Sequence, residues 1–185
     1  MTLGMIILGR QGSGKGTQAV RIAERFGIIH ISTGDMLRAA AEEGTELGLQ
    51  AKSIMDAGEL VTDDVINGIV QERLKREDVL HSGFLLDGYP RTVGQATELK
   101  KLAAENLKLA INLEVSIEEV TQRMLSRGRQ DDTPEAIARR LELYEAETSP
   151  LIEWFEKESI LRVINGSGTE NDVYERVISE IEKSI

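Results

Sequence analysis

Residues 5–26 read MIILGRQGSGKGTQAVRIAERF, and the order of residue types in this stretch decides the fold. Residues 5–8 form a short, continuously apolar run, which is typical of a strand buried on both faces in a parallel sheet. Glycines then stand at positions 9, 12 and 14, and apolar residues recur at helical spacing at positions 19, 22, 23 and 26. A strand, a glycine-rich turn and a helix in this order predict a phosphate-binding loop.

Gly9, Gly14 and Lys15 fit the loop pattern G-x-x-x-x-G-K-[ST], but Gly16 stands where the pattern has a magnesium-binding hydroxyl. A glycine-rich turn lets backbone N–H groups point at phosphate oxygens, and the helix that follows adds the positive end of its dipole. Lys15 would supply a mobile charge to the β- and γ-phosphates. The alternative is a tight strand-to-helix turn followed by a surface lysine.

The composition narrows the class of protein. The 185 residues suffice for one domain, and a net charge of -10 argues against a protein that coats nucleic acid or binds an anionic membrane. The absence of cysteine excludes a disulfide scaffold and a thiolate metal site. The N-terminal segment has no basic region, and its apolar run is too short for a signal peptide or a membrane span, so we expect a cytoplasmic protein.

The alternation of strand and helix patterns continues along the chain. Further strands are predicted at 28–31, 84–86, 109–113 and 161–164. This order predicts an α/β fold in which a five-stranded parallel sheet is flanked by helices in three layers. Helix starts are indicated by a capping box of Ser116 with Glu119 and by Thr133 followed by Pro134.

Two intervals interrupt the alternation. Residues 32–61 have helical patterns with no strand candidate, and glycines 44, 48 and 58 are expected to interrupt the helices. We interpret this interval as an insertion. Residues 126–132 are a short polar loop between two helices. Both intervals lie on connections that come after strands, and ligands bind at the carboxyl ends of parallel strands.

Several polar side chains fall near these loops. Asp87 ends the third strand, where it would orient Mg²⁺ or its waters, or only cap the turn that follows. Residues 32–35 (STGD) would either cap a helix or contact a second ligand. His30 and His81 lack companions at metal-ligand spacing, so we expect structural roles for them. Arginine presents a planar fork of donors that matches phosphate oxygens, although each arginine taken singly would also fit a solvated surface; the candidates are Arg38, Arg91, Arg123, Arg127, Arg129 and Arg140.

Six stretches in the same order resemble the adenylate kinases that have a short lid: GSGKGTQ, ISTGDMLRAA, AGELVTD, GFLLDGYPRT, RGRQDDTPEAIARRLELY and VINGSGT. The resemblance covers nearly the whole chain and implies a P-loop NTPase-type fold. It implies a core of residues 1–31, 62–125 and 133–185, a nucleoside monophosphate-binding insertion at 32–61 and a short lid at 126–132. Longer-lid relatives sometimes carry a cysteine zinc site, and no zinc is implied here.

The resemblance also implies roles for individual residues. ATP would be bound by Gly12, Ser13, Gly14, Lys15, Gly16, Thr17, Arg123, Arg127 and Gly168. AMP would be bound by Thr33, Arg38, Glu59, Leu60, Val61, Gly88, Tyr89, Pro90, Arg91, Gln95, Arg129 and Arg140. Catalysis would depend on Lys15, Asp87, Arg91, Arg123, Arg129 and Arg140. Asp131 and Asp132 would serve lid closure and charge balance.

The implied reaction is a reversible, Mg²⁺-dependent phosphoryl transfer from ATP to AMP that gives two ADP. These nucleotides would be the partners of a monomer, with neither nucleic acid nor a membrane. Mg²⁺ would be held by phosphates and waters, with Asp87 acting through a water and no direct protein ligand, which accounts for Gly16. The alternatives are a UMP/CMP kinase and a non-catalytic nucleotide-binding regulator.

Two features of the sequence bear on these alternatives. Pyrimidine-nucleotide relatives usually carry Ala and Asn where this chain has Thr33 and Gln95, so both positions favour AMP. A regulator would be expected to lack some of the phosphate-facing groups, which are all present. Arg10 and Gln11 depart from the family, which commonly has a proline at position 11, and this departure bears on the stiffness of the loop.

Overall fold

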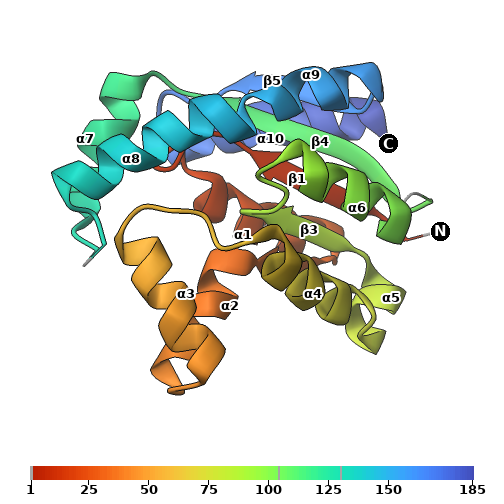
Figure 1. Cartoon of the computed structure of the whole chain (residues 1–185). Coiled ribbons are helices and arrows are strands. Elements are labelled where there is room, and N and C mark those ends of the chain that lie inside the picture. The colour runs from red at the N-terminus through yellow and green to blue at the C-terminus, as the bar shows by residue number, and fades with distance from the viewer. Residues whose placement is uncertain (1, 104, 130) are drawn as a thin grey trace.

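A computed structural model describes residues 2–103, 105–129 and 131–185. They form one sheet in which every neighbouring pair of strands is parallel, in the order β2-β3-β1-β4-β5 (Figure 1). The strands are β1 Gly4–Leu8, β2 Ile29–Ser32, β3 Phe84–Asp87, β4 Leu107–Glu114 and β5 Leu161–Asn165. The predicted α/β fold with a five-stranded parallel sheet is therefore confirmed, because each strand lies at its predicted place with ends shifted by two residues at most.

Helices connect the strands. They are α1 Lys15–Phe26, α2 Thr33–Glu42, α3 Glu46–Asp56, α4 Asp63–Leu74, α5 Glu77–Ser82, α6 Val93–Ala103, α7 Ile117–Arg127, α8 Pro134–Leu143, α9 Pro150–Lys157 and α10 Glu170–Ser184. A π-helical turn, η1 Tyr144–Thr148, joins α8 to α9. The segments α2 and α3 project away from the sheet, and α7 and α8 lie to one side of it (Figure 1).

The core has two layers because successive strand side chains point to opposite faces of the sheet. On one face, Met5 and Ile7 of β1 pack in a cluster with α1 and α10. On the other face, Ile6 and Leu8 pack in a second cluster with α2, α4, α6 and α9. The sheet is thus covered on both sides, which is why every residue of β1 and β3 is buried and why both strands are mostly apolar.

The insertion is an antiparallel pair of helices, and its glycines differ in role. Gly44 and Gly58 adopt positive φ angles of 73° and 80° just after α2 and α3 end, as expected of glycines that terminate helices. Gly48 was also predicted to break the helical pattern, and this prediction is wrong because it lies inside α3. A Cβ at this position would lie 2.2 Å from the carbonyl carbon of Ala40, so Gly48 permits the close packing of α3 on α2.

The loop that follows α7 is shorter than predicted. Residues 126 and 127 belong to α7, which ends where Gly128 takes a left-handed conformation, and Gln130 lies outside the described residues. Thr133 caps α8 as predicted, with Pro134 in its first turn. At α7, only half of the predicted capping box forms: Ser116 accepts the Glu119 N–H, while the Glu119 carboxylate bonds Arg123 and Ser167 instead.

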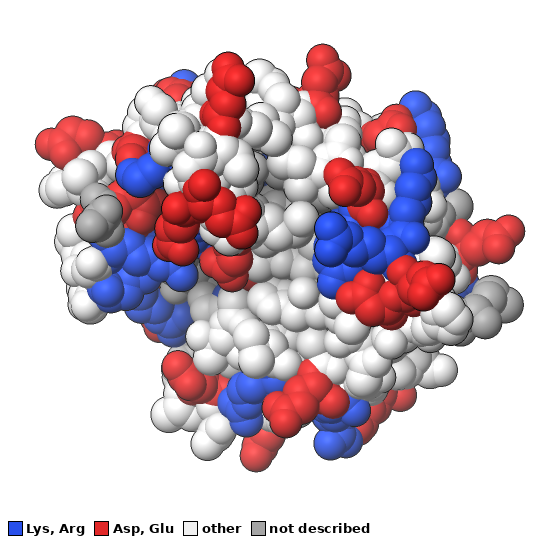
Figure 2. Space-filling view, turned by 90° about the horizontal axis from the view of Figure 1, so that it is seen from below, with Lys and Arg blue, Asp and Glu red and all other residues white. Residues whose placement is uncertain are grey.

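The face shown in Figure 2 carries basic side chains in small groups beside acidic ones. This arrangement agrees with the acidic composition, in which 32 Asp and Glu outnumber 22 Lys and Arg. Along the described parts of the chain, no helix combines the length and the apolar character that crossing a bilayer requires.

Candidate active site

A cavity of about 590 Å³ opens at the carboxyl ends of β1 and β3. Its lining comes from the loop between β1 and α1, the loop after β3, α2 and the end of α3, α7 and α8, and the loop between β5 and α10. Most of the site residues expected from the sequence line it, namely Gly12, Ser13, Gly14, Lys15, Gly16, Thr17, Arg38, Glu59, Leu60, Asp87, Gly88, Pro90, Arg91, Arg123, Arg127, Arg129, Arg140 and Gly168. Thr33, Val61 and Gln95 line a smaller adjoining hollow.

Tyr89 has a different place. Its side chain is buried in the core, and its hydroxyl oxygen lies within hydrogen-bond distance of two acceptors, Asn67 Oδ1 at 2.6 Å and the carbonyl oxygen of Gln95 at 3.1 Å. It is absent from the described residues that line either cavity. Tyr89 therefore shapes the loop that carries Gly88 and Arg91, and its phenol does not face a ligand.

The phosphate loop has the backbone geometry that an anion cradle requires. Gly12 and Gly14 adopt φ angles of 84° and 92°, a region that residues with a side chain rarely enter. A Cβ on Gly12 would lie 2.6 Å from the carbonyl oxygen of Val120, so the loop also packs directly on α7. These two glycines set the turn from β1 into α1, and residues 12–17 line the cavity, where the amides at the start of a helix favour an anion.

Lys15 is folded back onto its own loop. Its Nζ donates to the carbonyl oxygens of Gly9 at 2.7 Å and Arg10 at 2.8 Å. Burial lowers its pKa to about 8; the Asp87 carboxylate opposes this shift, and the positive charges of Arg91 and Arg127 reinforce it. A buried ammonium that lacks a bonded carboxylate gains most from the arrival of an anion.

Asp87 lies beside the loop at the end of β3. Its carboxylate is almost buried, and one oxygen lies 3.6 Å from the place that a Cβ on Gly16 would occupy. The nearest recorded basic group is His30 Nε2, at 3.6 Å from Asp87 Oδ2. The absent side chain at position 16 therefore leaves room between the carboxylate and the start of α1.

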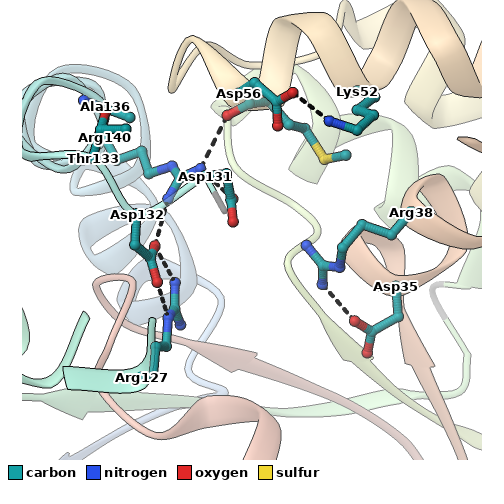
Figure 3. Close-up of polar contacts among 11 residues, drawn as sticks. Asp35, Arg38, Lys52, Asp56, Arg127, Asp131, Asp132, Thr133, Ala136 and Arg140 are labelled. Carbon is teal, nitrogen blue, oxygen red and sulfur yellow. Dashed lines mark hydrogen bonds and ion pairs between the residues drawn. The ribbon is translucent and has the colours of Figure 1, made fainter. Parts of the chain in front are cut away.

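The arginines on the lid side are held by two carboxylates (Figure 3). Arg127 donates to both oxygens of Asp132, at 2.6 and 2.9 Å. Arg140 donates to Asp132 at 3.0 Å, to Asp131, and to the carbonyl oxygen of Met55 at 3.0 Å. Burial would raise the pKa of Asp132, but its contacts with Arg127 and Arg140 outweigh burial and lower it. The pair of aspartates thus offsets the repulsion between two neighbouring guanidinium groups.

Arg91 and Arg129 have fewer anionic neighbours. Arg91 donates from Nε to the carbonyl oxygen of Gly88 at 2.9 Å, and burial lowers its pKa, with Asp87 opposing the shift. Burial and the charge of Arg127 lower the pKa of Arg129. A lowered arginine pKa means that the cation is poorly compensated, so both groups favour an anion in the cavity.

Arg123 and Arg38 lie on opposite sides of the cavity. Arg123, on α7, donates to Glu119 at 2.5 Å and to the carbonyl oxygen of Gly166 at 3.3 Å. Arg38, on α2, pairs with Asp35 of the same helix and is more exposed (Figure 3). Burial acts to raise the pKa of Asp35, but hydrogen bonds from Arg38 and Ser32 prevail and lower it.

The smaller hollow is lined by groups whose hydrogen bonds fix their orientation. The Gln95 amide accepts the Arg91 N–H at 2.7 Å and donates to Asp63 at 2.7 Å. The Thr33 hydroxyl lies 3.4 Å from the carbonyl oxygen of Asp87. Glu59 pairs with Arg139 of α8 through two contacts of 2.6 and 3.2 Å. The end of the insertion is therefore linked to α8.

The comparisons with known proteins agree with this geometry. The family model for adenylate kinase matches residues 7–160. The adenylate kinase of Corynebacterium aurimucosum is 49% identical over 181 residues, which cover 96% of this chain and 98% of the relative. The adenylate kinase of Stenotrophomonas maltophilia strain K279a is 44% identical over 184 residues, with the same two shares of 96% and 98%. Adenylate kinase 1 of a Synechocystis strain is 45% identical over 188 residues, covering all of this chain and 98% of the relative.

The chain belongs to the adenylate kinase family. It is accordingly a phosphotransferase, and the resemblance described from the motifs is confirmed. The alternatives of a UMP/CMP kinase and of a non-catalytic regulator are not favoured, since the relatives that the chain matches over 98% of their length are adenylate kinases.

Sequence reasoning missed part of the cavity wall of this adenylate kinase. Tyr144 and Thr148, both in η1, line the cavity, as do Met55 and Gln18. No local pattern in the sequence marks a π-helical turn. Among residues 2–103, 105–129 and 131–185, no group of three His, Cys, Asp or Glu side chains gathers as a metal ion would need.

Proposed function

We propose that this cavity holds ATP and AMP together and that the enzyme transfers the γ-phosphoryl group in line to AMP. The observation that carries the proposal is the convergence of Lys15, Arg91, Arg127, Arg129 and Arg140 on one cavity in a chain whose net charge is -10. An oxygen of the AMP phosphate attacks the γ-phosphorus while the bond from that phosphorus to the β–γ bridging oxygen breaks. Two ADP molecules result, and no proton is transferred.

The donor side is proposed as follows. The amides of the phosphate loop surround the ATP phosphates, and Lys15 leaves the carbonyl oxygens of Gly9 and Arg10 to follow the transferred group. Arg123 and Arg127 approach ATP from α7, and the backbone of Gly168 lies near the adenine of ATP. The residues that we assign to ATP are Gly12, Ser13, Gly14, Lys15, Gly16, Thr17, Arg123, Arg127 and Gly168.

The acceptor side is proposed to bind AMP between the loop after β3 and the insertion. Arg38 and Arg91 hold its phosphate, while Thr33 and Gln95 face its base. The remaining AMP contacts are proposed for Glu59, Leu60, Val61, Gly88, Tyr89 and Pro90, with Tyr89 acting through its backbone. Arg129 and Arg140 lie between the two nucleotides and stabilise the charge that spreads over the transferred oxygens.

The residues at the loop fit a hydrated magnesium ion that arrives with ATP. The Asp87 carboxylate is nearly buried, faces the loop across the gap left by Gly16, and accepts no hydrogen bond from the described side chains and amides. Asp87 would hold the ion through a water. An ion held there would neutralise part of the charge of the ATP phosphates.

Residues 32–61 and 126–132 are proposed to close over the two nucleotides, because transfer to AMP requires that water be excluded from the γ-phosphoryl group. The core would then comprise residues 1–31, 62–125 and 133–185. We propose that the enzyme acts as a cytoplasmic monomer whose partners are ATP, AMP and ADP, without nucleic acid, a membrane or zinc. The acidic composition supports the expectation that neither nucleic acid nor a membrane is a partner.

The test is ADP formation from Mg-ATP with AMP, UMP, CMP or GMP as the sole acceptor. We expect turnover with AMP alone. Turnover with UMP or CMP in place of AMP would keep the mechanism and overturn the acceptor. Equilibrium binding of ATP and AMP without ADP formation would overturn the function.

A further inference from the structure

The side chain of Arg10, in the phosphate loop, is held by two distant segments of the chain. Its Nε and Nη2 donate to Glu145 Oε1 at 2.9 and 2.5 Å. Its Nη1 donates to the carbonyl oxygen of Val115 at 3.1 Å, directly after β4. The guanidinium carbon also lies 5.3 Å from the centre of the Tyr144 ring. All three guanidinium nitrogens of this partly buried arginine therefore donate hydrogen bonds.

The π-helical turn that receives Arg10 also contacts the acceptor side. Glu145 and Thr148 both belong to η1, and the Thr148 hydroxyl donates to the carbonyl oxygen of Arg91 at 2.8 Å. The phosphate loop and the Arg91 loop are thus tied to one five-residue turn. Single π-helical turns are uncommon and occur frequently at functional sites.

The backbone of Arg10 holds the interior of the loop. Its carbonyl oxygen accepts the Ser13 N–H at 3.1 Å and the Lys15 ammonium at 2.8 Å. The loop has glycines at positive φ before and after this residue, at positions 9, 12 and 14, and no proline restricts it. A loop of this composition has many accessible backbone states, so an external anchor on Arg10 would limit them.

We propose that Arg10 is a positioning residue: its ion pair with Glu145 fixes the phosphate loop, and with it Lys15, relative to Arg91. Gly9 and Gln11, on either side of Arg10, line the cavity, but Arg10 is absent from the described lining. Arg10 therefore does not touch substrate. The proposal rests on the proposed function, since it concerns the place of the ATP phosphates relative to the acceptor.

The test is a double-mutant cycle of Arg10→Ala, Glu145→Gln and the two combined, with kcat and KM measured for ATP and for AMP. We expect each single change to lower kcat/KM for ATP about 3- to 10-fold, as for coupled charged partners in contact. The kcat/KM for ATP of the double variant should be no lower than that of the less active single variant. KM for AMP should change less than about 2-fold, a split that a general loss of stability would not produce.

The matched control is Arg25→Ala. It removes another ion pair between distant segments, Arg25 with Glu182 at 2.5 Å, in which both side chains are half exposed and lie outside the cavity. It should leave the ATP kinetics unchanged.

Three outcomes would overturn the inference: unchanged ATP kinetics in Arg10→Ala, losses that simply multiply in the double variant, or an equal loss in Arg25→Ala. Glu145→Gln keeps the shape of a half-exposed side chain, so it tests the pair even where Arg10→Ala folds poorly. Absence of ADP formation by the unsubstituted enzyme would overturn the function itself, and the inference with it.

Discussion

The phosphate loop and the helical insertion serve the two phosphates of the proposed reaction, but they are held in different ways. The loop lies between β1, whose residues are all buried, and α1, which buries one face against the sheet. Lys15 is held by carbonyl oxygens of the loop itself. The insertion buries only Thr33, Leu37, Gly48 and Ala51 among the described residues of its helices, and Arg38 is more than a third exposed. The donor side is thus built into the core, while the insertion buries few of its own residues and is linked to α8 by contacts of Arg139 and Arg140.

The largest effects are expected where the donor and acceptor sides meet. Lys15→Ala and Arg91→Ala should each lower turnover at least about 100-fold, because a cation placed at the transferred group contributes on the order of 10³ to 10⁵ in rate. Steady-state ADP formation measures the loss. Thermal unfolding provides the control, since Lys15 lacks a bonded carboxylate and its removal should not unfold the protein. Near-normal rates in both variants would contradict the assigned roles.

A smaller and one-sided effect is expected on the acceptor side. Arg38→Ala should raise KM for AMP about 10- to 100-fold, the range for losing a hydrogen bond between charged groups, and leave KM for ATP nearly unchanged. Lys52→Ala is a matched control, because Lys52 lies in the same insertion and pairs with Asp56 away from the cavity. An equal rise of KM for AMP in both variants would show that insertion stability, rather than phosphate binding, is responsible.

The pH dependence distinguishes the two sides further. Lys15 has a pKa of about 8, so it loses its positive charge as the pH rises through that value in the free enzyme. We expect kcat/KM for ATP to fall above about pH 8, by up to about tenfold per unit, while kcat falls less because bound phosphates raise the pKa of Lys15. A kcat/KM for ATP that stays level to about pH 9.5 would contradict this role.

The smallest effect concerns packing within the insertion. Gly48→Ala should destabilise the protein by about 1–3 kcal/mol, because a methyl group would overlap the backbone of Ala40. Gly68→Ala, in an exposed and open position of α4, should stabilise it by about 0.5–1 kcal/mol. Thermal unfolding measures both. Equal shifts in the same direction would mean that α2 and α3 separate without cost.

The phosphate loop was predictable because its signals are local. A buried strand, glycines that permit positive φ, and a helix start occupy consecutive residues, so each part restricts the next. The insertion was recognised as helical for the same reason. Gly48 was misread because its conformation is ordinary helix; the reason for its being glycine lies in the backbone of Ala40, eight residues away.

The sequence by itself determined the fold class, the family and the identity of most residues that line the cavity, because these follow from periodicity and from motifs in a set order. Only the tertiary structure decided how the charges pair. Lys15 rests on carbonyl oxygens, Arg140 is held by Asp131 and Asp132, and Arg10 reaches Glu145 across 135 positions of the chain. The physical reason is that an ion pair depends on distances of a few ångströms between side chains, and these distances are set by how the sheet and helices pack.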